Sequence, residues 1–200
     1  MIEEELRSSG IRRIAGVDEA GRGACAGPLV VAAVILRDEM ATELSGVADS
    51  KTLTERERES LFSSILEFAE AYTLITIPPE EIDELGLHKC NIEGMRRAVN
   101  GLKVKPEYVL TDGYEIPGIP IPNLAIWKGD QVALSISAAS IIAKVHRDRI
   151  MSELEIEYPG YGLARHKGYV TKAHSQALAV HGVSAIHRKS YANIARLLNH

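Results

Sequence analysis

The chain has 200 residues, of which 46% are hydrophobic and 25% are charged, the composition of an ordinary globular protein. This length suits one domain with its own core, and the composition excludes collagen-like, coiled-coil and disordered chains. No apolar run reaches the roughly 18 residues of a membrane span, and the acidic start lacks the pattern of a signal peptide. Cys25 and Cys90 have no CxxC spacing, so we expect a reducing, cytoplasmic location and no membrane contact.

Charge is divided unevenly along the chain. The net charge is −4, yet residues 158–200 contain no acid and carry +6, while residues 1–157 carry −10. A basic segment on an acidic body favours a polyanionic partner. A helical tail with a solvated basic face is the alternative explanation.

The first half of the chain predicts, in order, two strands, a helix, a strand and a helical stretch at residues 11–18, 28–36, 54–70, 72–77 and 79–101. The glycine-rich link 21–27 predicts a hairpin connection between the first two strands. Thr54 and Glu57 can form a capping box, which marks the start of the first helix. A break near Gly86 divides the last stretch.

The second half predicts a strand, a turn, a second strand and two helical segments at residues 107–111, 114–123, 124–127, 131–157 and within 184–198. The early strands can pair antiparallel, whereas the later ones alternate with helices and favour a parallel part. The chain therefore predicts an α/β fold, a mixed sheet with helices packed on it. We expect a single domain over residues 1–200, with a basic, helical C-terminal part from about residue 158.

Acidic residues follow two predicted strands or begin the long helix: Asp18, Glu19, Asp112 and Asp130. Carboxylates at neighbouring strand ends can converge, and their convergence is costly unless a cation neutralises them. Carboxylate oxygens favour Mg²⁺ or Mn²⁺. Each residue also has an ordinary structural explanation, because Asp is common at turns and Asp130 suits a helix N-cap.

The loop that begins Gly21-Arg22-Gly23 matches the pattern G-x-G-x-x-G/A. A dinucleotide site needs this loop to open a helix, but here Pro28 and a strand-like run follow, so the context that such a site requires is missing. What remains is a bare backbone that a ligand can approach closely, with Arg22 available for a phosphate. A tight turn that requires positive φ is the alternative.

Residues 17–23, VDEAGRG, are similar to the opening motif of ribonuclease HII. The other motifs of that family follow in order: DSK at 49–51, TDG at 111–113, KGD at 128–130, AASIIAK at 138–144 and HKGY at 166–169. The resemblance covers about residues 12 to 195, and the combination of motifs is highly specific.

The resemblance implies a ribonuclease H-like fold, a five-stranded mixed sheet flanked by helices. It also implies a monomeric endonuclease that cuts the RNA strand of RNA–DNA hybrids and incises 5′ of single ribonucleotides in duplex DNA. Hydrolysis with two Mg²⁺ or Mn²⁺ ions would leave 5′-phosphate and 3′-hydroxyl ends, and a role in ribonucleotide excision repair and DNA replication would follow.

The same resemblance implies roles for individual residues. Asp18, Glu19, Asp112 and Asp130 would be catalytic and hold the metal. Gly21, Arg22 and Gly23 would read the ribose 2′-hydroxyl, the one local mark of RNA, and Tyr169 would sit at the RNA–DNA junction. Further substrate contacts are expected at Lys51, Ser140, Lys144, Lys167 and Arg188.

Two other classes stay open at this point. A junction resolvase of the same fold would share the acids without needing the glycine loop, and it would cleave an all-DNA four-way junction. A non-enzymatic module that binds RNA or hybrids would bind without divalent metal and leave the strand intact. A nucleotide-binding protein is disfavoured because the glycine loop lacks its helix.

Overall fold

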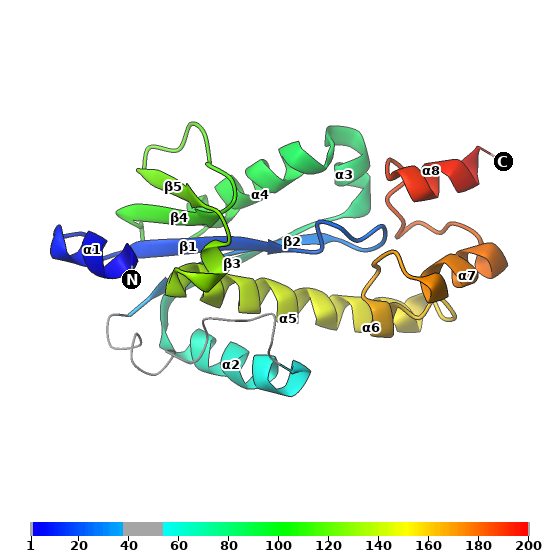
Figure 1. Cartoon of the computed structure of the whole chain (residues 1–200), viewed down its shortest axis with the longest axis horizontal. Coiled ribbons are helices and arrows are strands. Elements are labelled where there is room, and N and C mark those ends of the chain that lie inside the picture. Colours follow the sequence, from blue (N-terminus) through cyan, green and yellow to red (C-terminus); the bar gives the residue numbers. More distant parts are fainter. Residues whose placement is uncertain (1, 38–53, 200) are drawn as a thin grey trace.

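The computed structural model describes residues 2–37 and 54–199, and its strands form one mixed sheet in the order β3-β2-β1-β4-β5 (Figure 1). The strands are β1 Ile14–Ala20, β2 Leu29–Leu36, β3 Ala69–Ile77, β4 Tyr108–Asp112 and β5 Asn123–Ile126. β2 pairs antiparallel with both β1 and β3, whereas β4 pairs parallel with both β1 and β5. The predicted mixed sheet is confirmed.

Helices connect and flank these strands. They are α1 Ile2–Ser8, α2 Glu55–Phe68, α3 Pro79–Leu85, α4 Leu87–Asn100, a 3-10 turn η2 Gly129–Gln131, α5 Leu134–Glu157, α6 Leu163–His166, α7 Lys172–His181 and α8 Ala192–Leu198. The capping box of Thr54 and Glu57 at the start of α2 is confirmed, and so is the break at Gly86. α1 was not predicted. α6, α7 and α8 confirm the predicted helical C-terminal part, although the bounds of α6 and α7 were not predicted. In the described part of the chain, no helix combines the length and apolar character of a membrane span.

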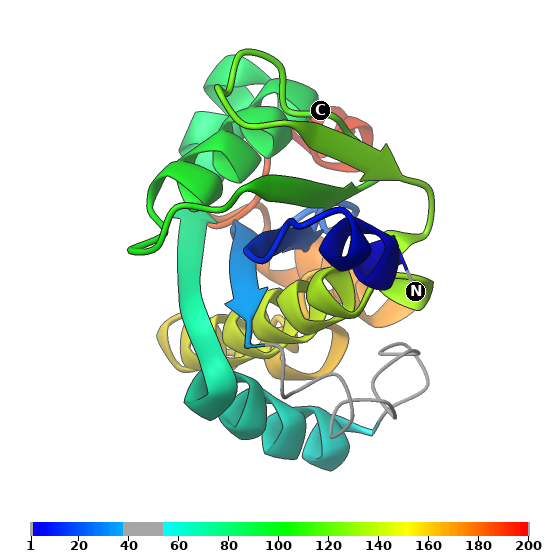
Figure 2. The same cartoon turned by 90° about the vertical axis from the view of Figure 1, so that its left-hand side faces the viewer.

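The sheet lies between two helical layers, which Figure 2 shows with α4 above it and α5 and α2 below. Successive residues of a strand face opposite sides, so Ala15 and Val17 of β1 pack with α4, while Ala20 packs with α5. A Cβ at Gly16 would lie 2.0 Å from the backbone of Ser135 in α5. Only glycine allows this close approach of α5 to the central strand.

The C-terminal helices pack against the hairpin connection and the end of α5 (Figure 1). Cys25 and Ala26 share one apolar cluster with Met151 of α5, Leu178 of α7 and Ile194 of α8. The Gly27 N–H donates to the Ile186 carbonyl at 2.8 Å. The basic segment is therefore attached at the end of β1, where the predicted site residues begin.

Candidate active site

Asp18 and Asp112 end up side by side because β1 and β4 are parallel neighbours. The last paired residues are Val17 and Thr111, so the next residue of each strand is an aspartate at the same height and on the same face. The Asp112 Oδ1 accepts a hydrogen bond from the Gly129 N–H at 2.7 Å. This bond fixes the carboxylate against the turn that follows β5.

Glu19 comes from the same strand as Asp18 but points to the opposite face. There Asn91 of α4 and Arg22 favour its charged form, yet burial dominates and raises its pKa to about 7. Burial, with the charges of Glu19 and Asp112, also raises the pKa of Asp18 well above its usual range, while a bond from Ser140 opposes the rise. The carboxylates thus crowd one another at the end of the sheet.

A pocket of about 420 Å³ opens over this cluster. It is lined by Asp18, Glu19, Ala20, Gly21, Arg22, Gly23, Arg58, Asp112, Ser140, Ile141, Lys144 and Tyr169. The structure thus brings together nine predicted site residues from β1, the loop that follows it, β4, α5 and the C-terminal segment. Arg58 of α2 was missed, because a cation within the charged run of residues 55–59 gives no signal of its own.

Asp130 does not line this pocket. It is buried in η2, with 2% of its surface exposed, directly after Gly129, the residue that bonds Asp112. The alternative explanation of Asp130 as a helix N-cap is wrong, because α5 begins after Ala133 and has no side-chain cap.

The carboxylates fit a hard divalent cation. Among the residues that the structure describes, no three Asp, Glu, His or Cys side chains already form a metal-ligand set, so a cation would have to draw them together. The pocket offers only oxygen ligands of the kind Mg²⁺ and Mn²⁺ prefer. The Glu19 Oε2 is also buried without a hydrogen-bond partner, a state that a cation would relieve.

Gly21 and Gly23 of the loop have different structural roles. Gly21 has φ +90°, and a Cβ there would lie 1.9 Å from the Arg147 Nε, so the fold itself requires glycine. Gly23 has no such constraint, because its added Cβ would meet only the Tyr169 Cε1 at 3.7 Å. Glycine at position 23 therefore keeps the pocket open.

Buried arginines hold the loop from below. The Arg147 guanidinium donates to the carbonyls of Pro28, Lys167 and Ala26 at 2.9, 2.9 and 3.1 Å, and burial lowers its pKa to about 10. No carboxylate takes part in these bonds. The positive charge of the Arg147 guanidinium is therefore stabilised by backbone carbonyl oxygens.

Arg188 corrects a prediction. It was expected to contact substrate phosphate, but it is fully buried. Its guanidinium donates to the carbonyls of Gly27 and Arg22 at 3.0 and 3.2 Å and to the Tyr191 hydroxyl at 2.8 Å. Arg188 therefore shapes the glycine loop instead of touching a ligand.

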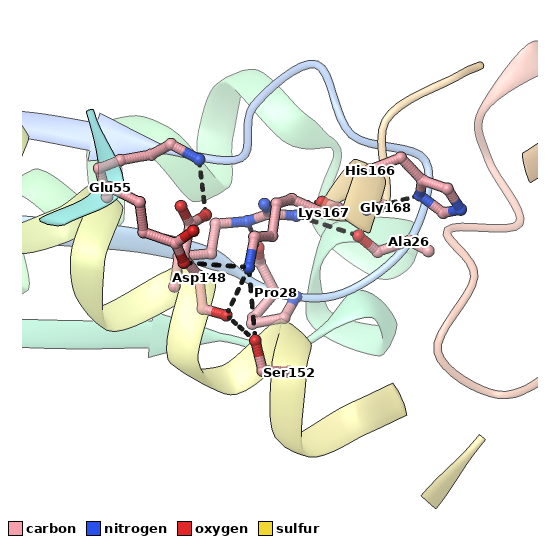
Figure 3. A network of polar contacts seen from close by, with 10 residues as sticks. Ala26, Pro28, Glu55, Asp148, Ser152, His166, Lys167 and Gly168 are labelled. Carbon is pink, nitrogen blue, oxygen red and sulfur yellow. Dashed lines mark hydrogen bonds and ion pairs between the residues drawn. The ribbon is translucent and has the colours of Figure 1, made fainter. Parts of the chain in front are cut away.

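The two described lysines that were predicted to bind phosphate differ in whether they line the pocket. Lys144 lines the pocket and pairs with Asp148 at 2.5 Å. The Lys167 side chain is only 14% exposed and donates to the Asp148 carbonyl and the Ser152 hydroxyl at 3.4 and 3.3 Å (Figure 3). It does not line the pocket, and its contact with phosphate stays a prediction. Lys51 lies outside the described residues. On α5, Ser140 joins Lys144 in the pocket, whereas Ser137 is buried.

Tyr169 stands at the pocket edge with 38% of its surface exposed. The Arg147 Cζ lies 5.6 Å from the centre of its ring. Its carbonyl accepts from the His174 Nδ1 at 3.0 Å, and the His174 Nε2 lies 3.1 Å from the His187 Nε2. The His187 Nδ1 accepts from the Ser184 N–H, so both buried imidazoles are neutral and carry their protons toward Tyr169.

Comparisons with known proteins agree with this geometry. The ribonuclease HII family matches residues 15–194. Ribonuclease HII of Salinispora tropica is 53% identical over 194 residues, which are 97% of this chain and 72% of that protein. The crystal structure of ribonuclease H2 from Pyrococcus horikoshii OT3 matches with a TM-score of 0.82 and 30% identity, covering 94% of this chain and 97% of that one.

A more distant structure shares the fold. Bst-RNase HIII in complex with Mn²⁺ matches with a TM-score of 0.74 and 20% identity, over 94% of this chain and 69% of that one. The family match spans both the acidic strand ends and the loop at which Tyr169 lies. The chain therefore belongs to the ribonuclease HII family and is a ribonuclease H, an endonuclease that hydrolyses RNA in RNA–DNA hybrids.

Proposed function

We propose that the chain incises duplex DNA on the 5′ side of a single embedded ribonucleotide, in addition to cutting longer RNA strands in hybrids. The observation that carries this proposal is one pocket that combines a carboxylate cluster with Gly21, Gly23 and Tyr169. The carboxylates suit phosphodiester hydrolysis, and the open loop suits contact with a 2′-hydroxyl. An enzyme with this substrate must be in the same compartment as the DNA, and we propose the cytoplasmic location that is expected from the sequence.

Recognition of the ribose rests on backbone groups. A 2′-hydroxyl can donate and accept hydrogen bonds, and it is the only group that separates RNA from DNA at a given nucleotide. The loop brings its N–H and carbonyl groups within reach because Gly23 has no side chain. Arg147 and Arg188 bond the carbonyls at positions 22, 26, 27 and 28, so the loop is held in place before the substrate arrives.

Asp18, Glu19 and Asp112 would hold Mg²⁺ or Mn²⁺ in the pocket, and Asp130 would complete the set from η2. Bst-RNase HIII, which shares the fold, is recorded with Mn²⁺. When bound there, two such ions would supply an activated water and would neutralise the charge on the leaving 3′-oxygen. The Gly129 N–H and the Ser140 side chain orient Asp112 and Asp18, so these carboxylates present fixed oxygen atoms to the cation.

The substrate backbone would be held by the groups on the α5 side of the pocket. Ser140 and Lys144 lie one helical turn apart on α5, and Arg58 of α2 lines the same wall. The two cations can contact phosphate oxygens without reading sequence, while the Ser140 hydroxyl keeps its hydrogen bond to Asp18 beside them. This agrees with a nuclease that acts on any sequence containing a ribonucleotide.

The direct test uses a labelled DNA duplex with one ribonucleotide, with and without Mg²⁺. We expect one product, cut immediately 5′ of the ribonucleotide with a 3′-hydroxyl end, and only with the metal. The all-DNA duplex and an all-DNA four-way junction are the controls and should stay intact. Cleavage of a long hybrid without any cleavage of the single-ribonucleotide duplex would overturn the proposal.

A further inference from the structure

Trp127 is an exposed aromatic side chain beside the carboxylates. It is the only tryptophan of the chain, and 82% of its surface is exposed. It lines a second pocket of about 430 Å³ with Glu19, Arg22, Asp112, Gly113, Tyr114 and Lys128. Glu19, Arg22 and Asp112 line the first pocket too, so the two pockets meet along the carboxylates.

The turn that carries Trp127 is anchored on both sides. The Gly113 N–H donates to the Ile126 carbonyl at 3.0 Å, and the Gly129 N–H donates to Asp112 at 2.7 Å. Trp127 and Lys128 are thus fixed between two bonds to the end of β4. The indole projects from a rigid support, so its exposure is not that of a loose loop.

Both residues of this turn adopt states that cost free energy. Lys128 has φ +54°, a left-handed conformation that residues other than glycine rarely take. An indole left in water forgoes the burial that a large aromatic side chain normally gains. Unfavourable features that coincide at a pocket next to a catalytic cluster point to a ligand contact.

The lining suits a nucleotide. Trp127 and Tyr114 offer aromatic faces, and Lys128 and Arg22 offer positive charge, with the Arg22 Cζ lying 4.6 Å from the centre of the Tyr114 ring. Aromatic faces beside cations are the combination that binds sugars, bases and phosphates of a nucleic-acid strand. The first pocket also combines an aromatic side chain, Tyr169, with a cation, Lys144.

The direction of the strand follows from the proposed function, on which this inference rests. The ribose at the glycine loop and the next nucleotide at Tyr169 occupy the first pocket, and the cleaved bond lies over the shared carboxylates. The strand continues across them into the second pocket. We propose that this second pocket binds the nucleotide on the 5′ side of the cleaved bond, with Trp127 packed against its sugar or base and Lys128 at its phosphate.

Because Trp127 is the only tryptophan, fluorescence excited at a wavelength that tryptophan absorbs and tyrosine does not reports on this pocket alone. The wild-type chain would be titrated in EDTA with three duplexes, and a gel shift on the same samples would establish saturation. One duplex has a central ribonucleotide, one has no nucleotide on the 5′ side of it, and one ends two nucleotides to its 3′ side. We expect quenching with the first and third duplexes only. Equal quenching by all three, or none at saturation, would overturn the inference.

Kinetics give an independent readout with matched variants. Trp127→Ala should raise KM about tenfold or more, since one base–aromatic contact has this size, and should leave kcat within about twofold. Trp127→Phe should restore most of the loss. Ile156→Ala removes a side chain that is 83% exposed on α5 outside both pockets, and it should behave as wild type. An unchanged KM in Trp127→Ala, with the wild-type chain still cleaving, would overturn the assignment of the second pocket and leave the proposed function supported. A wild-type chain that leaves the ribonucleotide intact would refute the proposed function itself.

Discussion

Gly23 and Tyr169 face each other across the pocket, and the space between them would be filled by one added methyl group. A Cβ at position 23 would lie 3.7 Å from the Tyr169 Cε1, an ordinary contact, whereas a Cβ at Gly21 would lie 1.9 Å from the Arg147 Nε. Two glycines of one motif therefore answer to different constraints. One is required by the fold, and the other leaves room where we propose that the ribose binds.

Gly23→Ala should therefore affect activity, whereas Gly21→Ala should affect stability. Gly23→Ala should fold with a Tm within a few degrees of wild type, yet lose most cleavage, because its methyl group narrows the space between the loop and Tyr169. Gly21→Ala should unfold at markedly lower temperature, because φ +90° is strained for alanine. Thermal unfolding and kcat/KM on the single-ribonucleotide duplex would be measured for both. Near-normal activity of Gly23→Ala would show that the glycine loop does not recognise the ribose.

Asp112→Asn should abolish turnover while the protein stays folded. An asparagine oxygen can still accept from the Gly129 N–H, and loss of one charge relieves repulsion on Asp18. We therefore expect an unchanged or higher Tm in EDTA and no measurable cleavage at saturating Mg²⁺. Retained cleavage would show that Asp112 is not a required ligand.

Glu19 should destabilise the metal-free protein at neutral pH. Its pKa in the folded chain is raised to about 7 from the usual 4.5, so its unfavourable contribution is absent below pH 4.5 and complete above pH 7. In EDTA, Glu19→Gln should be more stable than wild type at pH 8 by up to about 3 kcal/mol, and the difference should shrink toward pH 4.5. A difference independent of pH would contradict this origin.

The buried histidines should make the fold sensitive to acid. Burial lowers the pKa of His187 to about 4 from 6.5, with the neighbouring His174 adding to the effect. The stability that neutral His187 contributes is complete above pH 6.5 and is lost as the pH falls toward 4. Urea unfolding from pH 7 to 4 should therefore show a steeper loss for wild type than for His187→Gln. The exposed His88, changed to Gln, is the control and should follow wild type.

The parts of the fold that could be predicted from the sequence are those that depend on local sequence patterns. The apolar runs of β1 and β2, the capping box at Thr54 and the break at Gly86 involve residues close in the chain. Asp18 and Asp112 were predictable because each lies toward the C-terminal end of its strand, and parallel strands end at the same edge.

The roles of Arg147 and Arg188 depend on contacts that the sequence does not display. The carbonyls that they bind lie between 20 and 166 residues away along the chain. An arginine is rarely buried without a carboxylate partner, which is why Arg188 was expected at the surface. The η2 turn likewise separates Asp130 from α5, a boundary shift that helix patterns resolve poorly.

Tyr169 should matter most where RNA meets DNA. Its ring is fixed by Arg147 and by the bond from His174 to its carbonyl, so it can pack on the sugar after the ribonucleotide, where a deoxyribose leaves more room than a ribose. A stacking contact is worth roughly 1–3 kcal/mol, or about tenfold to a hundredfold in rate. Tyr169→Ala should lose that factor in kcat/KM at a single ribonucleotide and much less within a long hybrid.

The matched variant is Tyr169→Phe, which keeps the ring and removes only the hydroxyl. It should retain near-wild-type kcat/KM on both substrates, because packing on a sugar needs the face of the ring and not its hydroxyl. The His174 bond reaches the backbone carbonyl of residue 169, so neither substitution disturbs it, and both variants should melt near wild type. If Tyr169→Ala slowed both substrates equally while its Tm stayed unchanged, Tyr169 would be a general binding residue and preference for the junction would have to come from another part of the pocket.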